Sequence, residues 1–137
     1  MSKSFTLAEA NALVPEIEKR LGEIRAKRSV YLRIHDAVFV QELANDVEKK
    51  SGPDFFDSDL EKDIQNLEET IYALSKEIDA LIEMGCILRS IDSGLIDLPG
   101  QHHGERVFFA WKAGEKQIGF IRHRGAAGAS TERTPIL

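Results

Sequence analysis

The sequence predicts a mainly α protein with a small β-unit, an α+β fold in which a long antiparallel helical hairpin is followed by a short C-terminal antiparallel β-sheet. Two observations predict it. Apolar residues recur at helical spacing through most of residues 1–92, and two β-rich runs follow within residues 93–137. We expect the hairpin, with its tip at about 46–58, and the β-head with its tail to pack as one domain.

The first helix is predicted to begin after Thr6. Thr6 is a favourable N-cap, and Glu9 follows it by three residues, which together make a capping box. Pro15 then removes one backbone donor about two turns into the helix. We therefore expect a kink at Pro15, or a short first helix that continues into a second.

The later part of this helix, residues 30–43, carries apolar side chains that point in several directions. A helix that faces one neighbour needs a single apolar stripe, so a second surface must cover Leu32, Phe39 and Val40. We expect a homodimer in which two hairpins form a four-helix bundle. The alternative is that the chain's own β-head folds back over these side chains.

The second helix shows the strongest periodicity in the chain. Its apolar positions alternate at four and three residues: Leu60, Ile64, Leu67, Ile71, Leu74, Ile78, Leu81, Gly85 and Leu88. A turn near Gly52 predicts antiparallel helices in which residue i faces about 104 − i, so that Arg20 lies near Glu83. The basic residues between 19 and 33 would then face acidic partners within the chain, and nucleic-acid binding is not expected.

The C-terminal segment is predicted to form a β-hairpin. The run "GLIDLP" is expected to be a short strand that ends at Pro99, and "GQHHGE" a loop. The runs "RVFFAWK" and "QIGFIRH" are expected to pair, with Lys112 opposite Gln117 and Phe109 opposite Phe120.

Composition limits the class of protein. The chain has 137 residues and a net charge of −5, which disfavours non-specific nucleic-acid binding. Residues 1–85 hold 11 basic and 18 acidic groups, whereas residues 86–137 hold 7 basic and 5 acidic groups. One cysteine excludes an intrachain disulfide, and no apolar run is long enough to cross a membrane. We expect a cytoplasmic protein.

The sequence contains no recognised catalytic motif. His102, His103, Glu105 and His123 are possible metal ligands, but adjacent residues of an extended segment point in opposite directions, so no metal site is predicted. Cys86 follows the heptad positions and is expected to be a buried hydrophobe. We predict no catalytic residues and no cofactor, and the pattern favours a non-enzymatic protein.

Four motifs follow one another in the chain: "FTLAEANALVPEI", "GLIDLP", "AWKAGEKQIGFIRH", and Gly128 followed by "RTP". In this order they resemble a family of small bacterial proteins known as domain of unknown function 2203. The chain departs from the family pattern at Leu98, where the family has Phe, and at Ala110, where it has Cys.

The resemblance implies a helical hairpin and a β-segment but no activity. It draws attention to five polar or aromatic residues: Asp97, Trp111, Glu115, His123 and Arg133. They are expected either to line a ligand pocket or to fasten the sheet.

Three functions are compatible with these patterns. The first is a non-enzymatic interaction or scaffold module, a dimeric helical rod that carries the β-head. The second is a small-molecule or metal-binding protein that uses the β-head. The third is a regulator that inserts the acidic hairpin tip, with Asp54, Phe55, Phe56 and Asp57, into a larger enzyme such as RNA polymerase.

Overall fold

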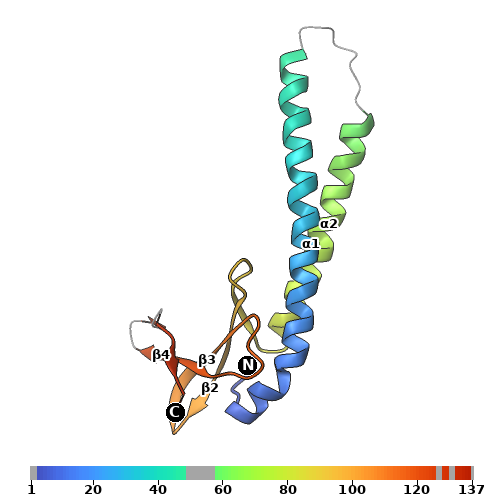
Figure 1. Ribbon diagram of the computed structural model, residues 1–137. Coiled ribbons are helices and arrows are strands. Elements are labelled where there is room, and N and C mark those ends of the chain that lie inside the picture. The colour runs from blue at the N-terminus through green and yellow to red at the C-terminus, as the bar shows by residue number, and fades with distance from the viewer. Residues whose placement is uncertain (1–2, 49–57, 126–127, 130–131, 137) are drawn as a thin grey trace. The chain divides into compact units, whose positions relative to one another are not determined.

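The computed structural model describes residues 3–48, 58–125, 128–129 and 132–136. Within these residues the chain forms two α-helices and six β-strands (Figure 1). The elements are α1 (Leu7–Glu48), α2 (Ser58–Glu83), β1 (Ile87–Ser90), β2 (Leu95–His102), β3 (Glu105–Lys112), β4 (Phe120–Gly125), β5 (Gly128–Ala129) and β6 (Thr134–Pro135). The chain is therefore mainly helical with an antiparallel β-sheet, as the sequence predicts.

The chain divides into two compact units. Unit 1 contains Met1–Ile24 and Glu77–Leu137, and unit 2 contains Arg25–Lys76. Unit 1 therefore holds the whole sheet together with the beginning of α1 and the end of α2. Unit 2 holds the remaining parts of the two helices. Within the described residues, neither helix combines the length and the apolar character needed to cross a membrane.

The predicted capping box opens α1. The Thr6 amide donates to Glu9 Oε1 at 2.9 Å, and the Glu9 amide donates to Thr6 Oγ1 at 3.1 Å. The helix then runs without interruption from Leu7 to Glu48 with Pro15 inside it, so the alternative of two successive helices is wrong. Pro15 removes the amide that would bond to the Asn11 carbonyl, but this loss is limited to one hydrogen bond of a long helix.

Contacts between α1 and α2 occur in both units. In unit 2, Gln41 Nε2 donates to Asp63 Oδ2 at 3.0 Å, which agrees with the predicted 104 − i register. In unit 1, Arg20 NH1 lies 3.7 Å from Glu77 Oε2. The predicted Arg20–Glu83 pair is therefore wrong by about two turns, because a register extrapolated from a turn of assumed geometry does not have to hold along the whole length of both helices.

The second helix ends earlier than the heptad pattern predicts. Gly85 has φ +97°, its amide donates to the Ile82 carbonyl, and the Cys86 amide donates to the Leu81 carbonyl. This pair of hydrogen bonds is the Schellman motif, which favours glycine at the left-handed position. Gly85 thus terminates the helix instead of continuing the apolar ladder, and residues 87–90 form β1 of the sheet.

The hairpin of β2 and β3 lies where the sequence predicts a loop. β2 pairs antiparallel with β3 from Leu95↔Lys112 to His102↔Glu105. His103 and Gly104 have φ of 52° and 78°, as in the two-residue turns typical of β-hairpins. The prediction that the strand ends at Pro99 is wrong. The Pro99 carbonyl accepts from the Phe5 amide and so points away from β3, which means that its missing N–H breaks no bond of the β2–β3 ladder.

The predicted pairing of β3 with β4 is wrong by one residue. Phe109 lies opposite Ile121, and Phe108 lies opposite Arg122. Gln117 is not part of β4, which begins at Phe120, so the connection is longer than the four-residue turn that the sequence predicts. A shift of one residue exchanges the faces on which neighbouring side chains meet, and it changes which charged groups share a face.

One face of the sheet carries the core of unit 1. The α1 residues that are buried recur at spacings of four and three. They share this core with every second residue of the fully buried runs 96–100 of β2 and 107–111 of β3. These side chains are Ala10, Val14, Ile17, Leu21, Ile24, Leu81, Ile96, Leu98, Val107, Phe109, Trp111, Ile118 and Ile121. The Ile118 amide donates to Asn11 Oδ1 at 2.7 Å, which connects the beginning of α1 to the loop before β4.

The N-terminal segment packs closely on β2. Phe5 forms a parallel bridge with Gly100, and its carbonyl accepts from the Gln101 amide at 3.2 Å. A Cβ at position 100 would lie against the Phe5 carbonyl oxygen and 2.5 Å from the Phe109 ring. Glycine is therefore required here for close approach of two backbones.

The substitution Gly100→Ala tests this packing. We expect it to lower the free energy of unfolding by about 2–3 kcal/mol, because backbone atoms and a buried ring must move to admit the methyl group. Urea denaturation followed by circular dichroism measures the change. Gly119→Ala is the matched control, since a Cβ there has no neighbour within 4 Å. Equal losses of stability in the two variants would contradict the close approach.

Candidate functional site

Asp97 is the one charged side chain that is buried among the described residues, with 2% of its surface exposed. It lies on β2, opposite Ala110 of β3. Its Oδ2 accepts from Arg89 Nε of β1 at 2.9 Å and from Arg122 NH2 of β4. Because β3 lies between β2 and β4, Arg122 reaches over Ala110 to make its contact. A buried carboxylate requires such partners, since desolvation of an unpaired charge is costly.

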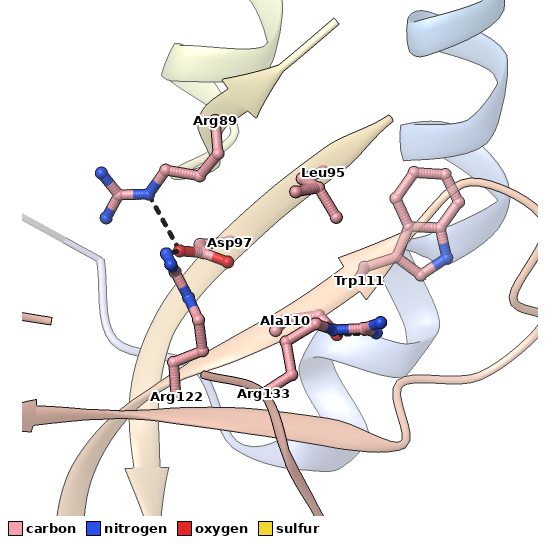
Figure 2. Close-up of a pocket in the computed structure, with 7 residues that line it drawn as sticks. All are labelled: Arg89, Leu95, Asp97, Ala110, Trp111, Arg122 and Arg133. Carbon is pink, nitrogen blue, oxygen red and sulfur yellow. Dashed lines mark hydrogen bonds and ion pairs between the residues drawn. The ribbon is translucent and has the colours of Figure 1, made fainter. Parts of the chain in front are cut away.

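A small pocket of about 50 Å³ adjoins this cluster. Figure 2 shows Arg89 and Arg122 converging on Asp97, while Arg133 extends beside Ala110 and toward Trp111. The lining residues are Arg89, Leu95, Asp97, Ala110, Trp111, Arg122 and Arg133. The pocket therefore combines apolar walls with three guanidinium groups and one carboxylate.

A second set of contacts joins the C-terminal segment to the sheet. Arg133 NH2 donates to Glu115 Oε1 at 2.7 Å and to the Ala110 carbonyl at 3.1 Å. Glu115 Oε1 also accepts from the Lys112 amide at 2.7 Å, and Trp111 Nε1 donates to the Glu115 carbonyl at 2.8 Å. The Arg133 guanidinium lies 4.1 Å from the centre of the Phe120 ring. Glu115 thus supports both the turn after β3 and the position of Arg133.

Positive charge is concentrated around the pocket. Burial lowers the pKa of the Arg122 guanidinium, and the neighbouring charges of Arg89 and Arg133 lower it further. The Nε atoms of Arg122 and Arg133 are buried without a hydrogen-bond partner among the described residues. A guanidinium remains protonated in proteins, so the lining keeps an excess of positive charge.

The structure brings together four of the five residues singled out in the sequence. Asp97, Trp111 and Arg133 line the pocket, and Glu115 bonds to two of its lining residues. His123 does not join them, because its Nδ1 lies 2.9 Å from Glu105 Oε1 on another part of the sheet. The predicted tip residues, Asp54, Phe55, Phe56 and Asp57, lie outside the described residues.

Sequence reasoning missed Arg89 and Arg122. The heptad pattern up to Leu88 predicts that Arg89 follows the end of the second helix, whereas it belongs to β1. The predicted pairing of Phe109 with Phe120 implies that Arg122 lies opposite Val107, but it lies opposite Phe108. The available signal was the alternation of Phe120, Arg122 and Arg124 along β4, which predicts a basic face once that strand is correctly paired.

The histidines and the cysteine form no further site in the part of the chain that the structure describes. No group of three or more His, Cys, Asp or Glu residues there could hold a metal ion. Cys86 is a buried free thiol. Burial raises its pKa to about 11, although the positive charge of Lys3 acts in the opposite direction.

Unit 2 leaves an apolar surface exposed. Leu32, Phe39 and Leu43 are 41%, 55% and 51% exposed, and Val40 beside them is 62% exposed. Spacings of seven and four residues place the first three on one side of α1. Gln41, which bonds to Asp63 of α2, lies on the opposite side of the helix. This surface, called the α1 stripe, agrees with the sequence expectation that α2 does not cover these side chains.

Comparison with protein family models identifies the family of this chain. Residues 3–136 match the model of the family described as "Uncharacterized conserved protein (DUF2203)". The chain belongs to this family. The family model thus spans both helices, the sheet and the residues of the pocket. Neither the comparison with curated proteins nor the comparison with solved structures gave a match.

Removal of the buried carboxylate tests its structural role. We expect Asp97→Asn to lower the free energy of unfolding by about 2–3 kcal/mol at neutral pH, because two guanidinium groups lose their counter-charge. The loss is limited by the partial exposure of Arg89, whose side chain is 37% exposed. Urea titration measures it, with Asp36→Asn as control, since the Asp36 side chain is 83% exposed. A change below about 0.5 kcal/mol for Asp97→Asn would place it among ordinary surface substitutions and contradict this role.

The reactivity of Cys86 tests its burial. At pH 8 we expect the native thiol to react with an aromatic disulfide reagent at least about 100-fold more slowly than the thiol of the urea-unfolded chain. The raised pKa leaves little thiolate in the folded state, and the thiolate is the reactive form. Absorbance of the released thiol product measures both rates. Similar rates in the two states would show that Cys86 is accessible and ionised.

Proposed function

We propose that the protein is a non-enzymatic interaction module that self-associates through unit 2. The observation that carries the proposal is the α1 stripe, formed by Leu32, Phe39, Val40 and Leu43. The partner that best fits the stripe is a second copy of the chain. Two helical hairpins then form an antiparallel four-helix bundle around the two stripes.

The apolar character of the stripe supports this proposal. Soluble monomers seldom expose several large apolar side chains next to one another, and such patches mark interaction surfaces. On α2 of the same unit, Ile71 and Tyr72 are also exposed, by 46% and 63%. Burial of a Leu or Phe side chain stabilises an association by about 1.5–3 kcal/mol. In an isologous dimer each side chain contributes twice.

The distribution of charge along α1 supports an antiparallel arrangement of the two copies. The basic residues Arg25, Lys27, Arg28 and Arg33 precede the middle of the stripe, and the acidic residues Asp36, Glu42 and Asp46 follow them. A two-fold axis near residues 37–38 would bring Leu32 of one copy to Leu43 of the other. The same axis would bring Arg28 near Asp46, so the basic part of one α1 helix would face the acidic part of the other.

The other two predicted functions do not depend on the α1 stripe. The polymerase regulator depends on Asp54, Phe55, Phe56 and Asp57, which lie outside the described residues, so no observation on the fold favours it. Small-molecule binding by the sheet is a separate question, because the pocket belongs to unit 1 and the α1 stripe belongs to unit 2.

Sedimentation velocity over a range of protein concentrations tests self-association. We expect the wild-type chain to sediment as a dimer, and the double variant Phe39→Ser, Leu43→Ser to raise the dissociation constant at least about 100-fold. This expectation follows because four apolar side chains would leave the dimer interface. Circular dichroism at high concentration verifies that the helices of the variant are retained.

The matched control is Ile82→Ser, which removes an equally exposed apolar side chain, 57% exposed, from unit 1. It should leave the dissociation constant within about threefold of the wild-type value. A wild-type chain that is monomeric at all concentrations would contradict the proposal and would favour coverage of the stripe by the chain's own sheet. Equal weakening by Ile82→Ser would show that association does not depend on the α1 stripe.

A further inference from the structure

We propose that the pocket beside Asp97 binds the phosphate group of a small ligand, held by the guanidinium groups of Arg89, Arg122 and Arg133. This inference is independent of the proposed self-association, because all of these residues belong to unit 1. Asp97 orients two of the arginines, and the phosphate group completes the charge of the cluster.

The first argument is the number of unused donors. A guanidinium group carries five N–H donors and accepts nothing. Together, Arg89, Arg122 and Arg133 donate four hydrogen bonds within the described residues, two to Asp97, one to the Ala110 carbonyl and one to Glu115. Most of their donors therefore have no acceptor among the described residues, and planar guanidinium groups match the oxygens of phosphate particularly well.

The second argument is charge. The three guanidinium groups of the lining face one carboxylate in the pocket, Asp97, which leaves two positive charges. Glu115, bonded to Arg133 outside the lining, reduces this excess but does not cancel it. Electrostatic repulsion from Arg89 and Arg133 contributes to the lowered pKa of Arg122. An anion in the pocket would relieve this repulsion, since the cluster keeps one positive charge when both Asp97 and Glu115 are counted.

The third argument is the rigidity of the arginines. Arg89 and Arg122 lie over the Phe108 ring, with guanidinium carbons 5.1 and 5.9 Å from its centre, and Arg133 lies over the Phe120 ring. Arg122 and Arg133 are largely buried, with 14% and 23% of their side chains exposed. Guanidinium groups that are already ordered lose little entropy when they bind an anion.

The size of the pocket defines the class of ligand. Its volume of about 50 Å³ exceeds the roughly 10–15 Å³ that one water needs by the same measure. It is far below the roughly 300–1,000 Å³ of pockets that enclose a whole drug-sized molecule. The pocket therefore fits inorganic phosphate or the terminal phosphate of a metabolite whose remainder stays outside, next to the partly exposed Arg89.

Isothermal titration calorimetry of the full chain with inorganic phosphate, at constant ionic strength maintained with chloride, tests the proposal. Glycerol phosphate and acetate, titrated in the same way, distinguish free phosphate, a phosphate monoester and a carboxylate. We expect saturable binding of phosphate or of the monoester at one site for each chain. Arg89→Gln should weaken it about tenfold or more, because a charge-assisted contact is lost. Asp97 keeps its contact with Arg122 in this variant, and circular dichroism verifies that the variant is folded.

The matched control is Arg106→Gln, which removes the same charge from an exposed position on β3 outside the pocket. It should bind phosphate with an affinity within about twofold of the wild-type value. If Arg89→Gln and Arg106→Gln weaken phosphate binding equally, the loss reflects only the change in net charge of the protein, and the proposal is overturned. A dissociation constant for phosphate and for its monoester that is no lower than that for acetate would also overturn it. Because Arg122→Gln could fail to fold, it serves only as a supporting variant, examined by phosphorus NMR line broadening.

Discussion

The pairing of Asp97 with two arginines is the interaction on which the arrangement of the sheet depends. It connects β1, β2 and β4, and the Arg122–Asp97 contact passes over β3 at Ala110. On β3, Arg122 lies opposite Phe108, and the Ala110 carbonyl accepts from Arg133 NH2. A carboxylate with 2% exposure is stable only with such partners, so the positions of the three strands are coupled to one charge. The same charge orients the donors of the pocket, which means that the stability of the sheet and the geometry of the site have a common origin.

One face of the sheet is apolar and the other carries charged side chains. Both faces result from the alternation of side-chain directions along the same strands. Ile96, Leu98, Val107, Phe109 and Trp111 belong to the core, while Asp97, Phe108 and Ala110 lie between them along the same strands. Along β4, Arg122 and Arg124 join the second face, and both guanidinium groups lie near the Phe108 ring. The apolar face forms the core of unit 1, and the basic face carries the arginines for which we propose anion binding. In unit 2 the two helices leave the apolar side chains of the α1 stripe exposed. The self-association that we propose would bury these side chains. The family match extends over both units, from residue 3 to residue 136, but by itself names no activity.

The sequence predicts the end of a helix well where a short local motif determines it. The Thr6–Glu9 capping box is present with both of its hydrogen bonds, and the apolar side chains of Leu32, Phe39 and Val40 are not covered by α2, as expected.

The pairing of segments that are distant in the sequence is predicted poorly. Gly85 satisfies the heptad spacing but ends α2, because the left-handed conformation that it adopts is not visible in apolar periodicity. His103–Gly104 makes a two-residue turn although the pair lacks the common Asn-Gly signature. The one-residue error between β3 and β4 hid Arg122 from the predicted site. Asp97, Trp111 and Arg133 were identified, but their role depended on Arg89 and Arg122, which only the strand pairing brings to them.

The central claim is that the arginine cluster on Asp97 binds a tetrahedral oxyanion and does not only fasten the sheet. Crystals of the full chain soaked in selenate, with anomalous data collected at the selenium edge, test it most directly. Selenate has the shape and charge of a phosphate dianion, and selenium locates it independently of any assumption about the protein. We predict an anomalous peak in the pocket, with selenate oxygens within hydrogen-bond distance of Arg89 and Arg122. Selenate bound only at other surface arginines or at lattice contacts, with the pocket filled by water, would contradict the account.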